Sequence, residues 1–458
     1  MTAVAAGPEA TDVPKDPAAA DRPTLRELAE RDSVDYILAT FVDMTGRACS
    51  KLVPVSAAEE LEAGGMGFSG FAAGNIGQGP QDPDLLVLPD PDSWMPLHFL
   101  QEGLAMVQCD PHVEGRPWPY APRVILRNTL ARLAARDMTA MVGAELEYFI
   151  LRRTEDGGIA TGDDEDTSPN PCYDARGVTR MFDHLTTVAA AMNELGWDNY
   201  ANDHEDSAGQ FEQNFKYADA LTTADRVIAA RYIISMIAHR EGYVASFMPK
   251  PFTERAGSGL HMHLSLWDGG TPLFPDAEDD RGLGLSETAY GFIGGLLEHG
   301  PALQVFLAPT VNSYKRANAT TTVSGATYAP QMSTYGGNDR TQSIRVPEGN
   351  RVELRTGDGA GNPYLMMASA LEAGLDGIDC SLDPGDPAEP GGNSAGAKRL
   401  PMTLLHAVDA LRADETILGC LSGDREIGEY YASLKETEFF TWHNRVSDWE
   451  VETYLTQI

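Results

Sequence analysis

"MVGAELEYFI" occupies residues 141–150 and combines an apolar run with two glutamates, Glu145 and Glu147. In an extended strand, residues two positions apart point to the same side of the sheet. The stretch therefore predicts a buried strand that presents two carboxylates on one face. Like charges so placed repel each other and take up protons unless an opposite charge lies nearby. The rest of the chain has to supply that charge.

Three further segments, 209–215, 258–267 and 351–356, show the same alternation of apolar and polar residues. Each taken alone fits a half-exposed antiparallel strand that turns its polar face to water. Together the four segments favour a lined cavity, because their polar faces hold Glu, His and Arg and no lysine. Besides the two opening glutamates, these faces carry Gln210, Glu212, Asn214, His261, His263, Ser265, Arg351, Glu353 and Arg355.

Five glutamates are expected to converge at this cavity: Glu145, Glu147, Glu205, Glu212 and Glu353. Divalent cations would remove their mutual repulsion, and carboxylate-rich sites suit Mg²⁺ or Mn²⁺ better than Zn²⁺. Arginines in the same region imply an anionic guest such as a nucleotide phosphate or a substrate carboxylate. Metal ions and arginines around a phosphate are typical of phosphoryl transfer. Because the chain has no GxxxxGK[ST] motif, the nucleotide site would be of another design.

Length and composition restrict the class of protein. With 458 residues the chain suits two or more domains, and a formal charge of −34 argues against nucleic acid or an anionic membrane as partner. No apolar run reaches the roughly 18 residues of a membrane span. The start has no secretory signal pattern, and the five cysteines are scattered, which together favour a cytoplasmic protein.

The chain is expected to have an α+β fold. Residues 1–23 read as a disordered tail, 24–119 as a smaller mixed domain, and 120–458 as a large domain of antiparallel strands and packed helices. In the smaller domain we expect a short helix within 22–33, where Leu25, Leu28 and Ala29 repeat at helical spacing, and a hairpin over 34–54. In the larger domain apolar periodicity predicts helices over 123–137, 178–196, 220–242, 287–303 and 363–378, with a surface loop over 381–401.

At these residues the sequence resembles the glutamine synthetase family. The matching motifs are "GAELEYF" (143–149), "HEDSAGQFE" (204–212), "GSGLHMHLSL" (257–266), "NSYKR" (312–316), "RVELRTGDGAGNPYL" (351–365) and "VSDWEVETYL" (446–455). They occur in the family's order, and the resemblance runs from about residue 33 to the end. "HEDSAGQFE" and "SGATYAP" (324–330) are most similar to the type III branch, which includes γ-glutamylmethylamide synthetases.

The resemblance implies a fold and an assembly. It predicts a small N-terminal β-grasp-like domain and a large catalytic domain that binds ATP and glutamate. The catalytic domain would carry a curved antiparallel sheet, a half-barrel, packed by helices. It also predicts a homo-oligomer, a dodecamer of two hexameric rings, because active sites in this family are shared between subunits.

The resemblance further implies two or three Mg²⁺ (or Mn²⁺) ions in each active site, with ATP as co-substrate. The ion on the glutamate side would be held by Glu147, Glu205 and Glu212. The ion that bridges the ATP phosphates would be held by Glu145, His261 and Glu353.

The same resemblance assigns the groups that bind the substrates. Arg340, Arg345 and Arg351 would stabilise the transferring phosphoryl group and ATP. His263 and Ser265 would line the nucleotide pocket, and Tyr217 would stack on the adenine. Arg316 and Arg355 would bind the glutamate carboxylates, with the backbone of Gly257 near the amino group. For Tyr217 and Ser265, ordinary core packing is the alternative.

The implied reaction has two steps. The γ-carboxylate of L-glutamate attacks the γ-phosphate of ATP, and a neutral amine then attacks the γ-glutamyl phosphate to release phosphate and leave an amide. Because water would hydrolyse the activated acyl group, a flap is expected, and residues 316–330 are placed to form it.

Departures from the family point to the amine. Ammonia-using members carry a glutamate in a "GYEAP" flap motif, where this chain has "ATYAP" (326–330) with Tyr328. They also carry an aspartate in a "DGSS" motif, where this chain has "GFSGFAAG" (67–74) with Gly70 or a close neighbour. Without those carboxylates, a small organic amine such as methylamine is favoured over ammonia, and ethanolamine and other alkylamines stay open. A genuine glutamine synthetase is the alternative.

Two other departures concern the substrate and regulation. Ala256 stands where the family usually has an asparagine, which weakens the expected contact with the substrate's amino group. The loop 384–401 has no tyrosine, so control by adenylylation is not expected. Two more distant alternatives are a guanidino kinase, which would phosphorylate nitrogen, and a non-catalytic relative. The six intact metal-ligand positions argue against the second.

Overall fold

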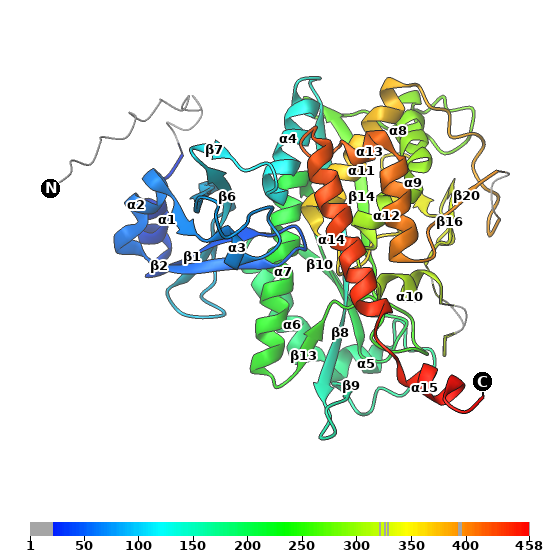
Figure 1. The fold of residues 1–458 in the computed structure, drawn as a ribbon, viewed down its shortest axis with the longest axis horizontal. Coiled ribbons are helices and arrows are strands. Elements are labelled where there is room, and N and C mark those ends of the chain that lie inside the picture. The colour runs from blue at the N-terminus through cyan, green and yellow to red at the C-terminus, as the bar shows by residue number, and fades with distance from the viewer. Residues whose placement is uncertain (1–21, 320–321, 325–326, 328, 393–395, 458) are drawn as a thin grey trace. The chain divides into compact units, whose positions relative to one another are not determined.

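The computed structural model describes residues 22–319, 322–324, 327, 329–392 and 396–457 (Figure 1). Nearly all of the segment predicted to be a disordered tail lies outside these residues. The chain divides into two compact units. Unit 1 comprises Met1–Phe41, Ser50–Ala72 and Gly79–Trp118, and unit 2 comprises Val42–Cys49, Ala73–Gln78 and Pro119–Ile458.

Unit 1 is built on a mixed sheet with strand order β2-β1-β6-β4-β3. The predicted helix is α1 (Leu25–Asp32), which begins at a capping box between Thr24 and Glu27. The predicted hairpin is present as adjacent strands, and β1 also pairs in parallel with β6. The strands are β1 (Tyr36–Val42), β2 (Ala48–Pro54), β3 (Met66–Phe68), β4 (Leu85–Pro89), β5 (Met95–Pro96), β6 (Leu104–Val113) and β7 (Arg116–Pro117). The short helices are η2 (Val55–Ala57), α2 (Ala58–Gly64), α3 (Gly70–Ala73) and η3 (Pro91–Ser93).

Unit 2 is organised around a large, mainly antiparallel sheet with order β10-β11-β8-β14-β19-β18-β17. Its central strand β8 contains the opening stretch of the sequence. The strands along this path are β8 (Thr139–Arg153), β10 (Asn199–His204), β11 (Gln210–Phe215), β14 (Leu260–Asp268), β17 (Tyr335–Gly336), β18 (Ile344–Arg345) and β19 (Val352–Leu354). Short strands that pair at its sides are β9 (Ile159–Thr161), β12 (Ala218–Asp219), β13 (Val244–Ser246) and β15 (Thr271–Pro272); β16 (Met332–Ser333) and β20 (Lys398–Arg399) pair with each other.

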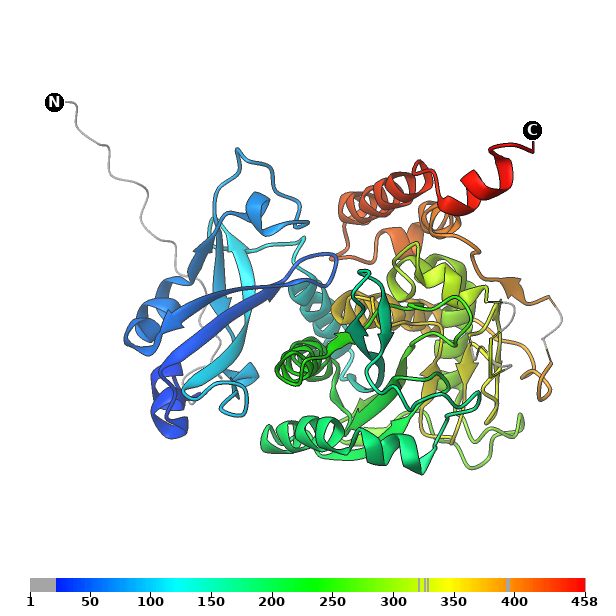
Figure 2. The same ribbon diagram turned by 90° about the horizontal axis from the view of Figure 1, so that it is seen from below.

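Helices pack around this sheet (Figures 1 and 2). Helix α7 contacts β8, and the almost wholly buried helix α11 contacts α4, α7, α8 and α9. The longer helices are α4 (Pro122–Ala134), α6 (Phe182–Glu194), α7 (Ala220–Arg240), α8 (Glu287–Glu298), α11 (Pro363–Asp379), α12 (Leu404–Ala413) and α14 (Arg425–His443). The shorter ones are α5 (Ala175–Arg180), α9 (Gly300–Leu307), α10 (Ser313–Ala317), α13 (Glu415–Leu418) and α15 (Asp448–Tyr454).

The prediction of one continuous helix was wrong at two places. The segment 178–196 is broken at Met181, whose ψ of 18° lies outside the helical range, so that α5 and α6 are separate. The segment 287–303 is broken at His299, because Pro301 follows and has no N–H to continue the hydrogen bonding of α8. The predicted loop over 381–401 also contains the two-residue strand β20.

Burial explains why the sheet has one polar face. The β8 side chains of Leu146 and Tyr148 are at most 1% exposed, whereas Glu145 and Glu147 alternate with them and point to the opposite side. The α+β fold with a half-barrel sheet packed by helices is therefore confirmed. Among the described residues, no helix is long and apolar enough to cross a membrane.

Candidate active site

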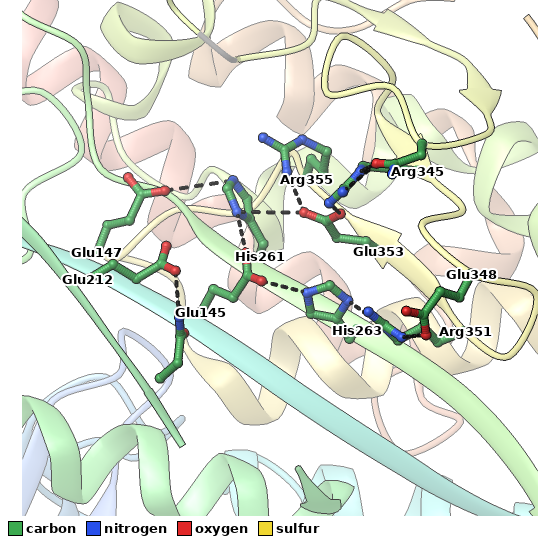
Figure 3. A network of polar contacts seen from close by, with 12 residues as sticks. Glu145, Glu147, Glu212, His261, His263, Arg345, Glu348, Arg351, Glu353 and Arg355 are labelled. Carbon is green, nitrogen blue, oxygen red and sulfur yellow. Dashed lines mark hydrogen bonds and ion pairs between the residues drawn. The ribbon is translucent and has the colours of Figure 1, made fainter. Parts of the chain in front are cut away.

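The register of unit 2's sheet places the predicted site residues opposite one another. In β8, Glu145 pairs with His261 of β14 and Glu147 pairs with Glu212 of β11, while His263 pairs with Glu353 of β19. Paired residues in adjacent strands share a face, so the four polar strand faces predicted from the sequence form one surface (Figure 3).

Two histidines hold the carboxylate of Glu145. Its Oε2 lies 3.1 Å from Nδ1 of His261, and its Oε1 lies 2.9 Å from Nε2 of His263. The other nitrogen of His263 lies 3.2 Å from Nε of Arg351. Burial opposes ionisation of Glu145, but the two histidine contacts outweigh it and lower its pKa. Glu145 is therefore the stably charged acid of the cluster.

Glu353 is fully buried between two arginines. Nη1 of Arg345 lies 2.6 Å from one carboxylate oxygen, and Arg355 forms an ion pair with the other. Burial again opposes ionisation, but the charges of His261 and Arg355 lower the pKa of Glu353. A buried carboxylate with such partners fixes the positions of both guanidinium groups.

Glu147 lies at the close approach of β8 and the segment before β14. Its Oε2 accepts a hydrogen bond from the backbone N–H of Gly259 at 2.7 Å and another from Nε2 of Gln210 at 3.0 Å. A Cβ at Gly259 would lie 2.8 Å from both Arg316 and His261 and 3.1 Å from Glu147. Only glycine leaves these three groups room to converge.

The remaining acids carry raised pKa values. Burial, together with the charges of Glu147 and Asp203, raises the pKa of Glu205 to about 8. Burial and the neighbouring glutamates raise the pKa of Glu212 well above its usual value. Burial and the charges of Glu145 and Glu147 raise the pKa of Asp203 to about 6. These groups face an excess of negative charge that a bound cation would neutralise.

Among the described residues, three groups could each hold a metal ion, because within each group the donor atoms lie within 4.8 Å of one another. One set is Glu147, Glu205 and Glu212, the same three residues that the sequence assigned to the glutamate-side ion. The three predicted ATP-side ligands, Glu145, His261 and Glu353, do not form one group. Glu145 and Glu353 form a group with His263, and Glu145 also forms a group with His261 and Glu212. Nε2 of His261 is buried and has no hydrogen-bond partner within the described chain. The carboxylate-rich donor sets and this free nitrogen fit divalent cations.

A cavity of about 430 Å³ opens over the acidic surface. The arginines Arg316, Arg340, Arg345 and Arg355 line it together with the glutamates. Arg316 and Arg355 are each only 4% exposed, and the Nε atom of each is without a hydrogen-bond partner in the part of the chain that the structure describes. Burial lowers the pKa of Arg316, which an anionic ligand would offset. Two buried guanidinium groups in one cavity, each with an unpaired Nε–H, fit a dicarboxylate.

A second cavity of about 390 Å³ lies on the other side of Glu145, which lines both. It contains the four residues predicted to bind the nucleotide, Tyr217, His263, Ser265 and Arg351. The ring of Tyr217 is half exposed, so it does not belong to the core. Ser265 accepts a hydrogen bond from Nε1 of Trp267, another aromatic side chain in this cavity.

Three of the four departures from the family pattern concern single residues, and these lie in different places. Tyr328 is outside the described residues, as is part of the predicted flap over 316–330. Gly70 begins α3 in unit 1. Ala256 is buried beside Gly257 at the wall of the 430 Å³ cavity, and its carbonyl accepts a hydrogen bond from Ser207.

Sequence reasoning did not single out several residues of the first cavity. Asp203 and Asp206 flank Glu205, and the alternation in "NDHED" could have indicated Asp203. Cys172 and Tyr173 come from an irregular segment between β9 and α5, where no periodic signal exists.

Comparison with known proteins agrees with this geometry. Residues 119–454 match the family described as glutamine synthetase, catalytic domain. The chain belongs to the glutamine synthetase family. It is 40% identical over 439 residues to the glutamate–methylamine ligase of Methyloversatilis universalis, covering 94% of this chain and 98% of the relative. It is 38% identical to the glutamine synthetase of Rhizobium meliloti, covering 94% and 99%.

Solved structures of similar proteins share the fold. A GmaS/ADP complex superposes with a TM-score of 0.88 at 44% identity, covering 94% of this chain and 99% of that one. GmaS without ligand gives a TM-score of 0.87 at 42% identity and the same coverage. Enzymes of the glutamine synthetase family use ATP and divalent metal ions and act on small molecules.

Proposed function

We propose that the protein is an ATP-dependent ligase that joins the γ-carboxylate of L-glutamate to a small organic amine. The observation that carries the proposal is the pair of cavities that meet at Glu145. One is lined by the buried guanidinium groups of Arg316 and Arg355, which suit a dicarboxylate, and the other offers aromatic rings and Arg351 to a nucleotide. A phosphoryl group that passes between them must cross the acidic surface.

In the first step the γ-carboxylate oxygen of glutamate attacks the γ-phosphorus of ATP, and the bond to the bridging oxygen breaks to release ADP. Arg316 and Arg355 hold the glutamate, and its α-amino group is placed near the backbone of Gly257. Arg345, which Glu353 orients, and Arg340 face the developing charge on the phosphoryl oxygens. Fixed guanidinium groups stabilise that charge without having to reorient during the reaction.

In the second step the amine nitrogen attacks the γ-carbonyl carbon. The carbon–oxygen bond to phosphate breaks, phosphate leaves with the electron pair, and the amine proton passes to solvent or to the leaving phosphate. Water has to be excluded until the amine arrives. The segment after α10, in which Thr327 lines the active-site cavity, would supply the flap that excludes it.

Two or three Mg²⁺ or Mn²⁺ ions would be held by Glu145, Glu147, Glu205, Glu212, His261 and Glu353, with His263 as a further donor. When bound, such ions neutralise phosphate charge and polarise the phosphoryl group. The donor chemistry favours these hard cations over Zn²⁺.

The identity of the amine is proposed from two sources. The positions that carry acids in ammonia-using members hold Tyr328 and Gly70 or a close neighbour, so the two carboxylates that would favour ammonium over an organic amine are missing from the sequence. The similarity to a glutamate–methylamine ligase supports methylamine or a similar amine. The second candidate is ammonia, favoured by the 38% identity to a glutamine synthetase.

We further propose that the enzyme works as a homo-oligomer, a dodecamer of two hexameric rings. Large apolar side chains near the C-terminus support association, because they are exposed in a single chain. Among them are Phe440, Trp442, Val446, Trp449 and Leu455.

The test is phosphate release with L-glutamate, ATP and Mg²⁺ across a panel of amines, with mass spectrometry of the product. Methylamine, ethanolamine, longer alkylamines and ammonia form the panel. A γ-glutamylamide formed from an organic amine in preference to glutamine supports the proposal. Preferential turnover of ammonia would make the protein a glutamine synthetase, and ATP consumption without any amide would reject the ligase altogether.

A further inference from the structure

Asp206 lines two neighbouring cavities at once. One is the 430 Å³ active-site cavity. The other, of about 360 Å³ and here called the side chamber, is lined by segments 161–171, 206–208, 254–255 and 323–324. Among the described residues, Asp206 is the one that lines both cavities, so it lies where the chamber adjoins the active site.

The position of Asp206 is set by its neighbours. It lies in the turn between β10 and β11, directly after Glu205. Asp166 holds both ends of that turn. Its buried carboxylate contacts Nε2 of His204 at 2.8 Å and accepts a hydrogen bond from the backbone N–H of Gly209. One carboxylate oxygen of Asp206 accepts a hydrogen bond from the hydroxyl of Ser324. The carboxylate is therefore held in place by a neutral hydroxyl group.

No Lys, Arg or His among the described residues forms an ion pair with Asp206. Arg255 also lines the side chamber, but its guanidinium group is already engaged. Its Nη1 donates to the carbonyl oxygen of Ala208 at 2.9 Å, and the group lies 4.0 Å from the centre of the Phe252 ring. The charge of Asp206 is thus available to a cation that enters from the chamber.

We propose that Asp206 binds the ammonium group of the amine substrate and that the side chamber is the space through which the amine arrives. This inference rests on the proposed ligase function. Alkylamines are cations at neutral pH, and a carboxylate between the chamber and the acyl group would concentrate them beside their target. Glutamate and ATP are anions, and the arginines that would hold them line the active-site cavities.

The walls of the side chamber suit a short substituent. Small polar and apolar residues, among them Thr167, Ser168, Pro169 and Val323, line it. Because one water occupies roughly 30 Å³ in the liquid, the volume is ample for a short alkyl or hydroxyalkyl chain. The chamber therefore admits amines larger than ammonia, with the ammonium group at Asp206.

The test compares Asp206→Asn with wild type, using methylamine and hydroxylamine as nucleophiles. Methylamine is a cation at neutral pH, whereas hydroxylamine is mostly neutral. Removing the charge should raise KM for methylamine about 10–100-fold, the usual effect of losing a hydrogen bond to a charged group. KM for glutamate and the rate with saturating hydroxylamine should change less than about twofold. Asp206→Glu should recover part of the affinity for methylamine.

Glu165→Gln is the matched control, because Glu165 is an exposed acid near the chamber, within 161–171, and is not one of the residues of that stretch that line it. It should behave as wild type. If Asp206→Asn lowers activity equally with methylamine and hydroxylamine, or raises KM for glutamate, Asp206 only shapes the active site and the inference fails. An unchanged KM for methylamine would also overturn the inference. If the wild-type protein itself forms no γ-glutamylamide, the proposed ligase function is wrong. If the wild type is active but the Asp206 variants behave otherwise than expected, only the inference on Asp206 is wrong.

Discussion

Binding of Mg²⁺ should release protons from the acidic cluster. The pKa of Glu205 is raised to about 8, by burial first and then by Glu147 and Asp203. At pH ~7 a group with that pKa carries about 0.9 proton, which must leave before the carboxylate can act as a ligand. Glu212, whose pKa is also raised, adds to the release. We therefore expect at least about 0.9 proton released for each metal ion bound at this set.

The same protonation makes the affinity depend on pH. Because the folded-state pKa is raised, the proton competes with the metal below pH ~8 and no longer competes above it. Glu205 alone should make the Kd for Mg²⁺ fall about tenfold for each pH unit up to pH ~8, and Glu212 should make the fall steeper. For Glu145, whose pKa is lowered, no competition is expected in this range.

Isothermal titration calorimetry of Mg²⁺ binding in buffers of different ionisation enthalpy measures both quantities. Glu205→Gln should weaken binding and also reduce the number of protons released. A Kd that stays constant between pH ~6.5 and ~8.5, or binding without proton release, would refute the reasoning, because the acids would then be ionised before the metal arrives.

Three further predictions concern packing and charge. Arg123→Met should lower the free energy of unfolding, measured by urea titration, by about 3–5 kcal/mol. The substitution leaves Asp225 buried without the two 2.9 Å hydrogen bonds from Arg123. A loss under ~1 kcal/mol would contradict this prediction. Raising the pH from ~6 to ~9 should destabilise the wild-type protein more than the His299→Gln variant. Burial opposes protonation of His299, but hydrogen bonds to Asp414 and a second aspartate raise its pKa, so the stabilisation from the protonated ring is lost as the pH rises through that pKa. Equal dependence of the melting temperature on pH in the two proteins would contradict this prediction. Gly259→Ala should reduce kcat/KM by about 100-fold or more, while circular dichroism shows an unchanged fold. The added Cβ would displace Arg316, His261 and Glu147. Near wild-type activity would show that the space at Gly259 is not needed.

Local sequence predicted the strands of the site because a strand has a period of two residues. The spacing of His261, His263 and Ser265 in β14, like that of Glu145 and Glu147 in β8, is enough to place these side chains on one face. The helix breaks at Met181 and His299 were missed, since apolar periodicity continues across both. Periodicity reports which face is buried and does not report whether the backbone stays helical.

The sequence by itself determined the α+β class, the polar strand faces and, through its motifs, the family. Only the tertiary structure decided which residues meet. Strand register set Glu145 between His261 and His263, and the turn at Asp206 placed a carboxylate between two cavities. The physical reason is that register and loop packing depend on contacts between segments far apart in the chain, whereas periodicity depends only on neighbours.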